Sequence, residues 1–153
     1  FVTIIILAVA ANAAWGETAT RKMSITIDDL PAVRLRESNE ALADMTRKLI
    51  AHIDHHDIPA VGLVNEGKLY RDGELDRDRV GLLRIWSEAG YELGNHSYSH
   101  MDLHRSTLEE FEEDVIRGEE VTRALLAEYN LKLRYFRHPL KSVLCYFAPY
   151  SHA

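Results

Sequence analysis

The run AVGLV at residues 60–64 decides how this 153-residue chain folds. Pro59 precedes it, and a polar loop rich in Gly, Asp and Arg follows at residues 65–77. Five successive residues without a polar side chain are typical of a strand buried on both faces, rather than of a strand with one face in water. We therefore expect residues 60–64 to form a fully buried strand.

Strand and helix patterns alternate on both sides of this run. Residues 23–27, 91–94 and 133–136 are further β-type runs, and apolar residues recur at helical spacing in residues 37–56, 80–90 and 108–129. Ser106 and Glu109 predict a capping box before the last helix. The order β-α-β-α-β-α-β predicts a parallel sheet, open or closed into a barrel. In either architecture, active residues lie at the carboxyl ends of the strands.

Composition narrows the possible functions. The length fits one domain, and 46% hydrophobic with 27% charged residues is ordinary for a globular chain. A net charge of -6 makes a nucleic-acid partner unfavourable. The single cysteine, Cys145, excludes an internal disulfide and any zinc site built on several thiolates. A metal site would need His and carboxylate ligands, and the eight His leave that question open.

The first residues differ from the rest of the chain. Residues 2–11 contain one polar side chain, Thr3, and lead into the small residues 11–14. This run is too short to cross a bilayer, so no transmembrane segment is expected, and the pattern is typical of a secretory signal peptide. We interpret residues 1–14 as a signal peptide remnant and expect export to the periplasm or beyond. The alternative is a buried N-terminal strand.

Reactive side chains follow the predicted strands. Asp28 and Asp29 follow the first strand, and burying two adjacent carboxylates is costly unless a cation lies between them. Neighbours on a strand point to opposite sides, so one Asp can bind a metal while the other acts as a base. The alternative is an acidic pair in a surface loop.

His96 follows the third strand, and His100 comes four residues later. If the chain is helical there, both imidazoles lie on one face and can hold a divalent metal together with a carboxylate from another strand. Such a set leaves positions for water, as in hydrolytic zinc sites. Arg137, after the fourth strand, would keep Asp28 ionised and oriented. The alternatives are two surface histidines and a surface arginine before Pro139.

The segments Thr26–Asp29, His96-Ser97-x-x-His100 and Arg137-x-Pro139 resemble, in this order, the first three motifs of the polysaccharide deacetylases. This is carbohydrate esterase family 4, which shares the nodulation-protein-B homology domain. The resemblance runs from about residue 23 to residue 139 and includes residues 62–65 and 86–94. It implies an α/β fold, a distorted (β/α) barrel that is incomplete, with about four βα units. The expected divisions are 1–14, 23–139 and an atypical tail, 140–153.

The resemblance also implies a chemistry. Asp29, His96 and His100 would bind a divalent metal, usually zinc, and Asp28 would be the general base. Arg137 would position Asp28, and a backbone N–H just after Pro139, that of Leu140, would help to hold the oxyanion. The substrate would be an N-acetylated, or sometimes O-acetylated, polysaccharide such as a chitin-like polymer or peptidoglycan.

The sequence also departs from the family. The general-acid His of a Leu-x-His motif and an Asp partner for Arg137 are absent, and His152 lacks the Leu and comes too early. We therefore expect a domain truncated after the third motif, with impaired activity. The alternatives are a non-catalytic carbohydrate- or metal-binding fragment, and another metal-dependent hydrolase of the same barrel type.

Two weaker clusters complete the candidates. Three His and two Asp within residues 52–57 could hold a second metal, although a solvated helix end is the plainer reading. The acidic residues 72, 74, 76 and 78 alternate like a calcium loop, but its central Gly and closing Glu are missing.

Overall fold

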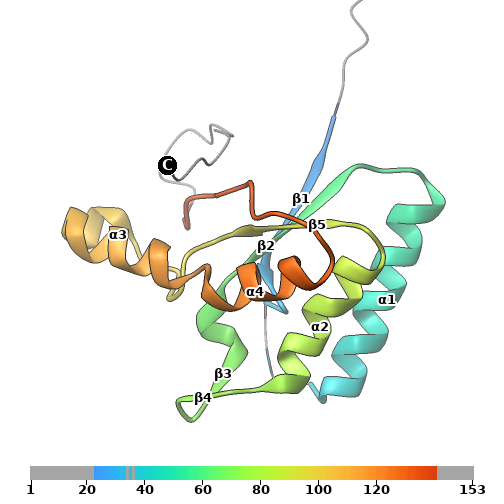
Figure 1. The fold of residues 1–153 in the computed structure, drawn as a ribbon, viewed down its shortest axis with the longest axis horizontal. Coiled ribbons are helices and arrows are strands. Elements are labelled where there is room, and N and C mark those ends of the chain that lie inside the picture. The colour runs from blue at the N-terminus through green and yellow to red at the C-terminus, as the bar shows by residue number, and fades with distance from the viewer. Residues whose placement is uncertain (1–22, 34, 36, 141–153) are drawn as a thin grey trace, which may run out of the picture.

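Three parallel strands form the centre of the fold in the computed structural model, which describes residues 23–33, 35 and 37–140 (Figure 1). The strands are β1 (Ile25–Leu30), β2 (Ala60–Val64) and β5 (Glu92–Asn95), in the order β1-β2-β5. Both pairings are parallel, and every residue of β2 is buried. The expected buried strand and the mixed α/β class are thus confirmed. The expected signal peptide remnant, and residues 141–153 of the expected tail, lie outside the described residues.

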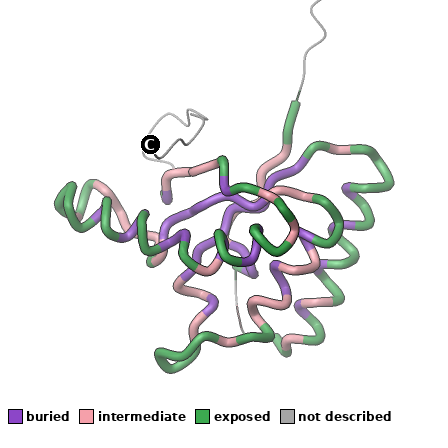
Figure 2. The backbone as a smooth tube through the Cα atoms, in the orientation of Figure 1, coloured by how far each residue is buried: buried purple, intermediate pink, exposed green. Residues whose placement is uncertain are grey.

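Helices cover the sheet. They are α1 (Asn39–His55), α2 (Arg77–Glu88), α3 (Leu108–Arg117) and α4 (Glu120–Glu128). α1 packs against α2, and both α2 and α4 contact β5. Their core includes Trp86, Leu93 and Leu125, each about 1% exposed or less. Figure 2 shows buried residues concentrated on the strands and on the helix sides that face them.

The connections contain more structure than the sequence predicted. The polar loop after β2 holds a 3-10 helix, η1 (Glu66–Leu69), and a hairpin of β3 (Tyr70–Arg71) and β4 (Glu74–Leu75). A second 3-10 helix, η2 (Leu103–Arg105), precedes α3. β1 extends to residue 30, so the acidic pair lies within the end of this strand rather than after it. The pairing of β1 with β2 shifts register between Ile27 and Leu30, around that acidic pair.

The predicted long helix is interrupted. α3 ends at the C-cap residue Gly118, and α4 begins two residues later. The capping box uses Thr107 and Glu110, one residue later than predicted, because both registers fit the sequence pattern. Leu108 is 67% exposed, so this apolar residue at the start of the predicted helix does not lie on its buried face.

The prediction of a fourth strand at residues 133–136 is also wrong. This segment meets β5 at one isolated parallel bridge, between Asn95 and Phe136. The Asn95 N–H donates to the Tyr135 carbonyl over 2.8 Å, and the Arg137 N–H donates to the Asn95 carbonyl over 3.0 Å. These two bonds fasten the segment at a single point, which places Arg137 at the carboxyl end of β5.

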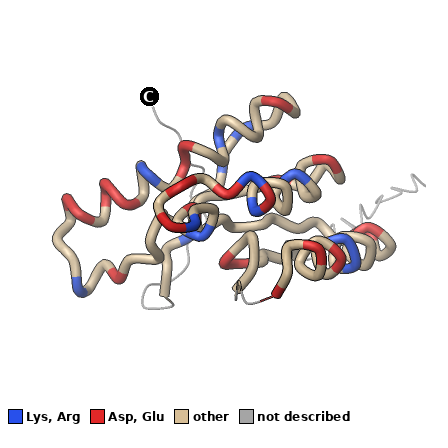
Figure 3. Tube along the Cα trace, turned by 90° about the horizontal axis from the view of Figure 1, so that it is seen from below, with Lys and Arg blue, Asp and Glu red and all other residues tan. Residues whose placement is uncertain are grey.

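Acidic residues follow one another along α3 (Figure 3). Among the described helices, none combines the length and the apolar character that crossing a membrane requires.

Candidate metal centre and active site

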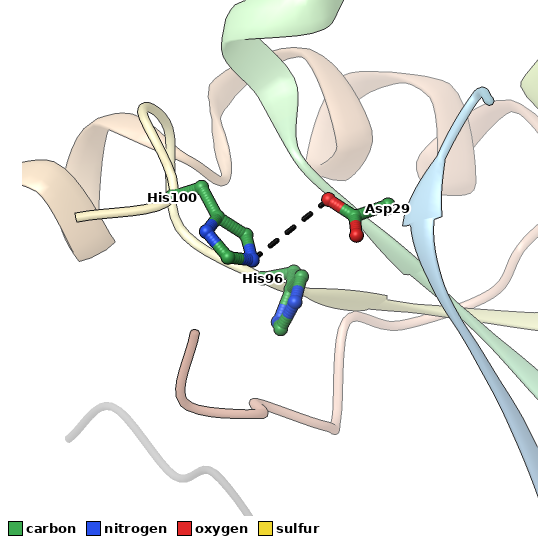
Figure 4. Close-up of side chains that lie close together, drawn as sticks. All are labelled: Asp29, His96 and His100. Carbon is green, nitrogen blue, oxygen red and sulfur yellow. Dashed lines mark ion pairs between the residues drawn. The ribbon is translucent and has the colours of Figure 1, made fainter. Parts of the chain in front are cut away.

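Asp29, His96 and His100 converge at one edge of the sheet (Figure 4). Asp29 comes from the end of β1, and the two histidines come from the loop directly after β5. One ligand atom from each residue lies within 4.8 Å of the others. The imidazole centroids are 5.0 Å apart, and His100 Nε2 is 3.9 Å from Asp29 Oδ1. The structure therefore brings together the three residues that the sequence analysis selected as metal ligands.

The histidines meet through a tight loop and not through a helix. Ser97 and His100 have φ angles of 63° and 61°, in the left-handed region, so the predicted helical turn is wrong. The Ser97 N–H donates to Asn95 Oδ1 over 2.6 Å, and the His100 N–H donates to Ser97 Oγ over 3.1 Å. These local side-chain acceptors replace the helical hydrogen bonds, and the resulting loop brings a nitrogen of each ring within 4.8 Å of an Asp29 oxygen.

His96 is held in the form that a metal requires. Its Nδ1 lies 2.8 Å from the carbonyl oxygen of Arg137, which can only accept a hydrogen bond. Nδ1 must therefore carry the proton, and Nε2 remains a free lone pair. Burial lowers the pKa of His96 below its ordinary value, and this outweighs the opposing effects of the Arg137 carbonyl and of Asp28. The ring is thus neutral near pH 7.

Asp29 is held by a lysine that the sequence analysis did not single out. The Lys68 ammonium donates to Asp29 Oδ1 over 2.9 Å, and to the carbonyls of Asp29 and Ala32 over 3.3 Å each. Burial by itself raises the pKa of Asp29. The hydrogen bond and charge of Lys68, with the charges of His100 and His96, outweigh burial and lower that pKa overall. The carboxylate is consequently ionised and ready to act as a ligand.

Asp28 and Arg137 lie beside this centre. Arg137 Nη1 donates to Asp28 Oδ1 over 3.3 Å and also to Thr26 Oγ1. The expected pairing of the guanidinium with the first Asp is therefore present. The planar guanidinium fixes the direction of the carboxylate through these contacts. The arrangement provides an oriented carboxylate next to a candidate metal centre.

The segment directly after β2 is hydrogen-bonded both to the loop that carries the two histidines and to the start of α4. The backbone N–H of Glu66 donates to the Ser97 carbonyl over 3.3 Å, and that of Gly67 donates to the Tyr98 carbonyl over 2.8 Å. The buried Glu66 carboxylate accepts the N–H groups of Val121 and Thr122, at the start of α4. The sequence could have indicated a role for this segment, because it follows a strand, as the other site residues do.

A second support comes from α3. The buried Asp114 carboxylate accepts the Ser99 N–H over 3.0 and 3.1 Å, and the Asp114 carbonyl accepts the Tyr98 N–H over 3.0 Å. Asp114 thereby fixes the middle of the histidine loop. No sequence pattern signals this role, because an acidic residue within an acidic helix is ordinarily exposed.

The residues expected at the oxyanion lie at the end of the described chain. Pro139 is buried, while Leu140 is 44% exposed with a φ of 58°. His138 stacks on Phe111, with ring centroids 4.7 Å apart. The role of the Leu140 N–H stays a prediction.

The weaker candidate clusters take structural roles. Asp76 is the N-cap of α2 and pairs with Arg71 and Arg79, so the acidic run does not form a calcium loop. The histidines of residues 52–57 lie at the exposed end of α1. Within residues 23–33, 35 and 37–140, one group of three His, Cys, Asp or Glu side chains has ligand atoms close enough to share a metal ion, namely Asp29, His96 and His100.

Comparisons with solved structures identify similar folds. A family 4 carbohydrate esterase from Bacillus anthracis matches with a TM-score of 0.55 and 21% identity, covering 76% of this chain and 47% of that one. A CE4 family pseudoenzyme from Bacillus anthracis has a TM-score of 0.54 and 19% identity, over 76% and 34% of the two chains. The peptidoglycan deacetylase PdaC from Bacillus subtilis has a TM-score of 0.50 and 19% identity, over 76% and 48%.

At these identities the likeness shows the fold alone, and the chain spans about a third to a half of the length of these structures. A comparison with curated proteins gave no match. The model of the family described as "Polysaccharide deacetylase", however, matches residues 16–146, which is most of the chain. The chain therefore belongs to the polysaccharide deacetylase family.

Proposed function

We propose that this chain carries the metal-binding and base-bearing part of an active site that removes acetyl groups from an N-acetylated or O-acetylated polysaccharide. The observation that carries the proposal is the convergence of Asp29, His96 and His100 beside the Asp28–Arg137 pair. Family membership supports the reaction class.

The donor set fits a divalent cation. Two imidazoles and one carboxylate are typical of hydrolytic zinc sites, and they also suit other first-row ions. The tautomer of His96 and the lowered pKa values of His96 and Asp29 support this fit, because ligands bind metal in their deprotonated forms. A divalent cation bound there would polarise the acetyl carbonyl and acidify water.

The chain's own residues supply the remaining chemistry. Asp28, oriented by Arg137, would accept a proton from the attacking water. The N–H of Leu140 would donate to the oxyanion. The departing amine also needs a proton, and the sequence holds no Leu-x-His motif to provide it. We therefore expect slow turnover from this chain alone.

The polymer is proposed to lie outside the cytoplasm. The apolar run at residues 2–11 supports export, and peptidoglycan is the substrate named for PdaC, a protein of similar fold. Peptidoglycan and chitin-like polymers are thus the substrates to test first.

Acetate release tests the proposal. The intact 153-residue chain would be incubated with acetylated chitooligosaccharides and with peptidoglycan, with and without Zn²⁺. Metal-dependent release that falls at least about a hundredfold in Asp28→Asn, with zinc binding retained, is the expected result. Equal metal content in the wild type, Asp29→Ala and His96→Ala would overturn the metal centre and with it the function.

The second candidate is a metal- or carbohydrate-binding fragment without catalysis. The missing general acid favours it, and a CE4 family pseudoenzyme is among the structures of similar fold. Zinc binding that requires His96, without acetate release from either polymer, would support this alternative.

A further inference from the structure

Lys68 occupies an unusual position for a lysine. Its side chain is only 22% exposed, and its ammonium forms three hydrogen bonds, with Asp29 Oδ1 and with the carbonyls of Asp29 and Ala32. An ammonium has three N–H groups, so all of its donors are used. Lysines in polar loops usually extend into water instead, which makes this a specific site for the charge.

The Lys68 ammonium and the His100 ring approach the same carboxylate oxygen. Lys68 Nζ is 2.9 Å from Asp29 Oδ1, and His100 Nε2 is 3.9 Å from that same atom. Asp29 Oδ1 therefore lies near the His100 ring and also accepts the hydrogen bond from the lysine. A divalent cation bound by Asp29 and the histidines would lie within a few ångströms of the ammonium.

Backbone contacts fix the segment from which the Lys68 side chain starts. Lys68 belongs to η1, directly after the middle strand β2, and its N–H donates to the Asn65 carbonyl over 3.0 Å. The preceding residue, Gly67, is bonded to the Tyr98 carbonyl, and a Cβ on it would come within 2.5 Å of that oxygen. The lysine side chain thus starts from backbone that is itself hydrogen-bonded to the loop that carries the two histidines, which keeps its Cα close to the candidate metal centre.

We propose that Lys68 is a built-in competitor for the carboxylate of Asp29 and lowers the affinity of the site for divalent cations. This inference rests on the proposed metal centre. Like charges repel strongly at short range, and the partial burial of Lys68 and Asp29 limits screening by water and salt. The ammonium also takes one of the lone-pair directions of Asp29 Oδ1. Loss of the positive charge should therefore strengthen metal binding.

Zinc titration of the intact chain against a chromophoric chelator tests the inference without any activity assay. We expect Lys68→Gln, which keeps a neutral donor, to bind Zn²⁺ about tenfold more tightly than the wild type. Lys68→Met is a second neutral variant, in case the first folds poorly. Lys68→Arg keeps the charge and should stay within about threefold of the wild type. The matched control is Lys48→Gln, since Lys48 is exposed on α1 and pairs only with Asp44 among the described ion pairs.

The outcomes separate the two proposals. If neutral variants at position 68 bind zinc with equal or lower affinity while the wild type binds better than His96→Ala, the competition is refuted and the metal centre stands. If the wild type binds no better than His96→Ala, the metal centre fails, and the role of Lys68 fails with it.

Discussion

The substitution Gly118→Ala tests how closely the junction of α3 and α4 packs against the histidine loop. A Cβ at this position would lie 2.6 Å from the Ser97 carbonyl carbon, 2.7 Å from the Tyr98 nitrogen and 2.9 Å from Asn95 Oδ1. The φ of Gly118 is -76°, which alanine adopts freely, so the expected effect comes from this contact alone.

The size of the effect follows from these distances. Ordinary contact begins near 3.4 Å, so helix and loop must separate by about 0.8 Å at the closest atom. Two of the three atoms are backbone and cannot rotate away. Overpacking of this kind costs about 1–3 kcal/mol of unfolding free energy. Metal sites tolerate errors in ligand distance of only about 0.2 Å, so the displaced loop should also bind Zn²⁺ at least about tenfold more weakly.

Urea unfolding and zinc titration on the same preparation measure both quantities. The matched control is Gly81→Ala on α2, where a new Cβ meets nothing within 4 Å. This control should gain up to about 1 kcal/mol from helix propensity and leave zinc affinity unchanged. A Gly118→Ala protein with wild-type stability and wild-type zinc affinity would refute the close packing described for this junction.

The remaining predictions concern the two buried carboxylates that support the site. Glu66→Ala leaves two N–H groups at the start of α4 without their acceptor and should cost about 2–3 kcal/mol in urea unfolding, whereas Glu113→Ala on exposed α3 surface should cost under about 0.5 kcal/mol. Burial raises the pKa of Glu66 above the ordinary value of 4.5, so the folded state holds the proton more tightly. The tighter proton binding by folded Glu66 stabilises the protein below pH 4.5, and this stabilisation is lost as the pH rises through the folded-state pKa. From about pH 4 to pH 7, the wild type should therefore lose unfolding free energy relative to Glu66→Gln. A difference between the two proteins that does not change with pH would contradict the raised pKa of Glu66. Asp114→Ala removes the acceptor of the Ser99 N–H and should weaken zinc binding about tenfold. Asp114→Asn keeps an acceptor oxygen and should retain most of the zinc affinity. An equal loss of zinc affinity in the two variants would point to a purely electrostatic role of Asp114.

The sequence predicted those parts of the fold that depend on local patterns. The strand at residues 60–64 and the helices α1 and α2 follow from uninterrupted apolar runs and helical spacing. The trio of Asp29, His96 and His100 was predictable because parallel strands bring their carboxyl ends to one edge.

The features that the sequence missed depend on tertiary contacts. At Gly118, where the predicted long helix is interrupted, an added Cβ would lie within 2.9 Å of atoms of Asn95, Ser97 and Tyr98, and a local pattern does not show this close approach. The left-handed residues Ser97 and His100 are stabilised by acceptors on Asn95 and on Ser97 itself, so spacing alone suggested a helix instead. Lys68 looks like any solvated loop lysine until the fold places it beside Asp29.

Because β2 lies between β1 and β5, it sets the distance between the two strands that lead to the candidate metal ligands. The candidate ligands follow the two outer strands, with Asp29 at the end of β1 and the histidines just after β5, and these two strands are two inter-strand spacings apart, about 9.6 Å. The backbone hydrogen bonds between neighbouring strands set this distance, whatever side chains the loops carry. A slip of β1 by one residue would carry Asp29 about 3.3 Å along the sheet and turn it to the opposite face. A change in the surrounding loops therefore leaves this spacing intact, whereas a change in the alignment of the three strands would separate the candidate ligands.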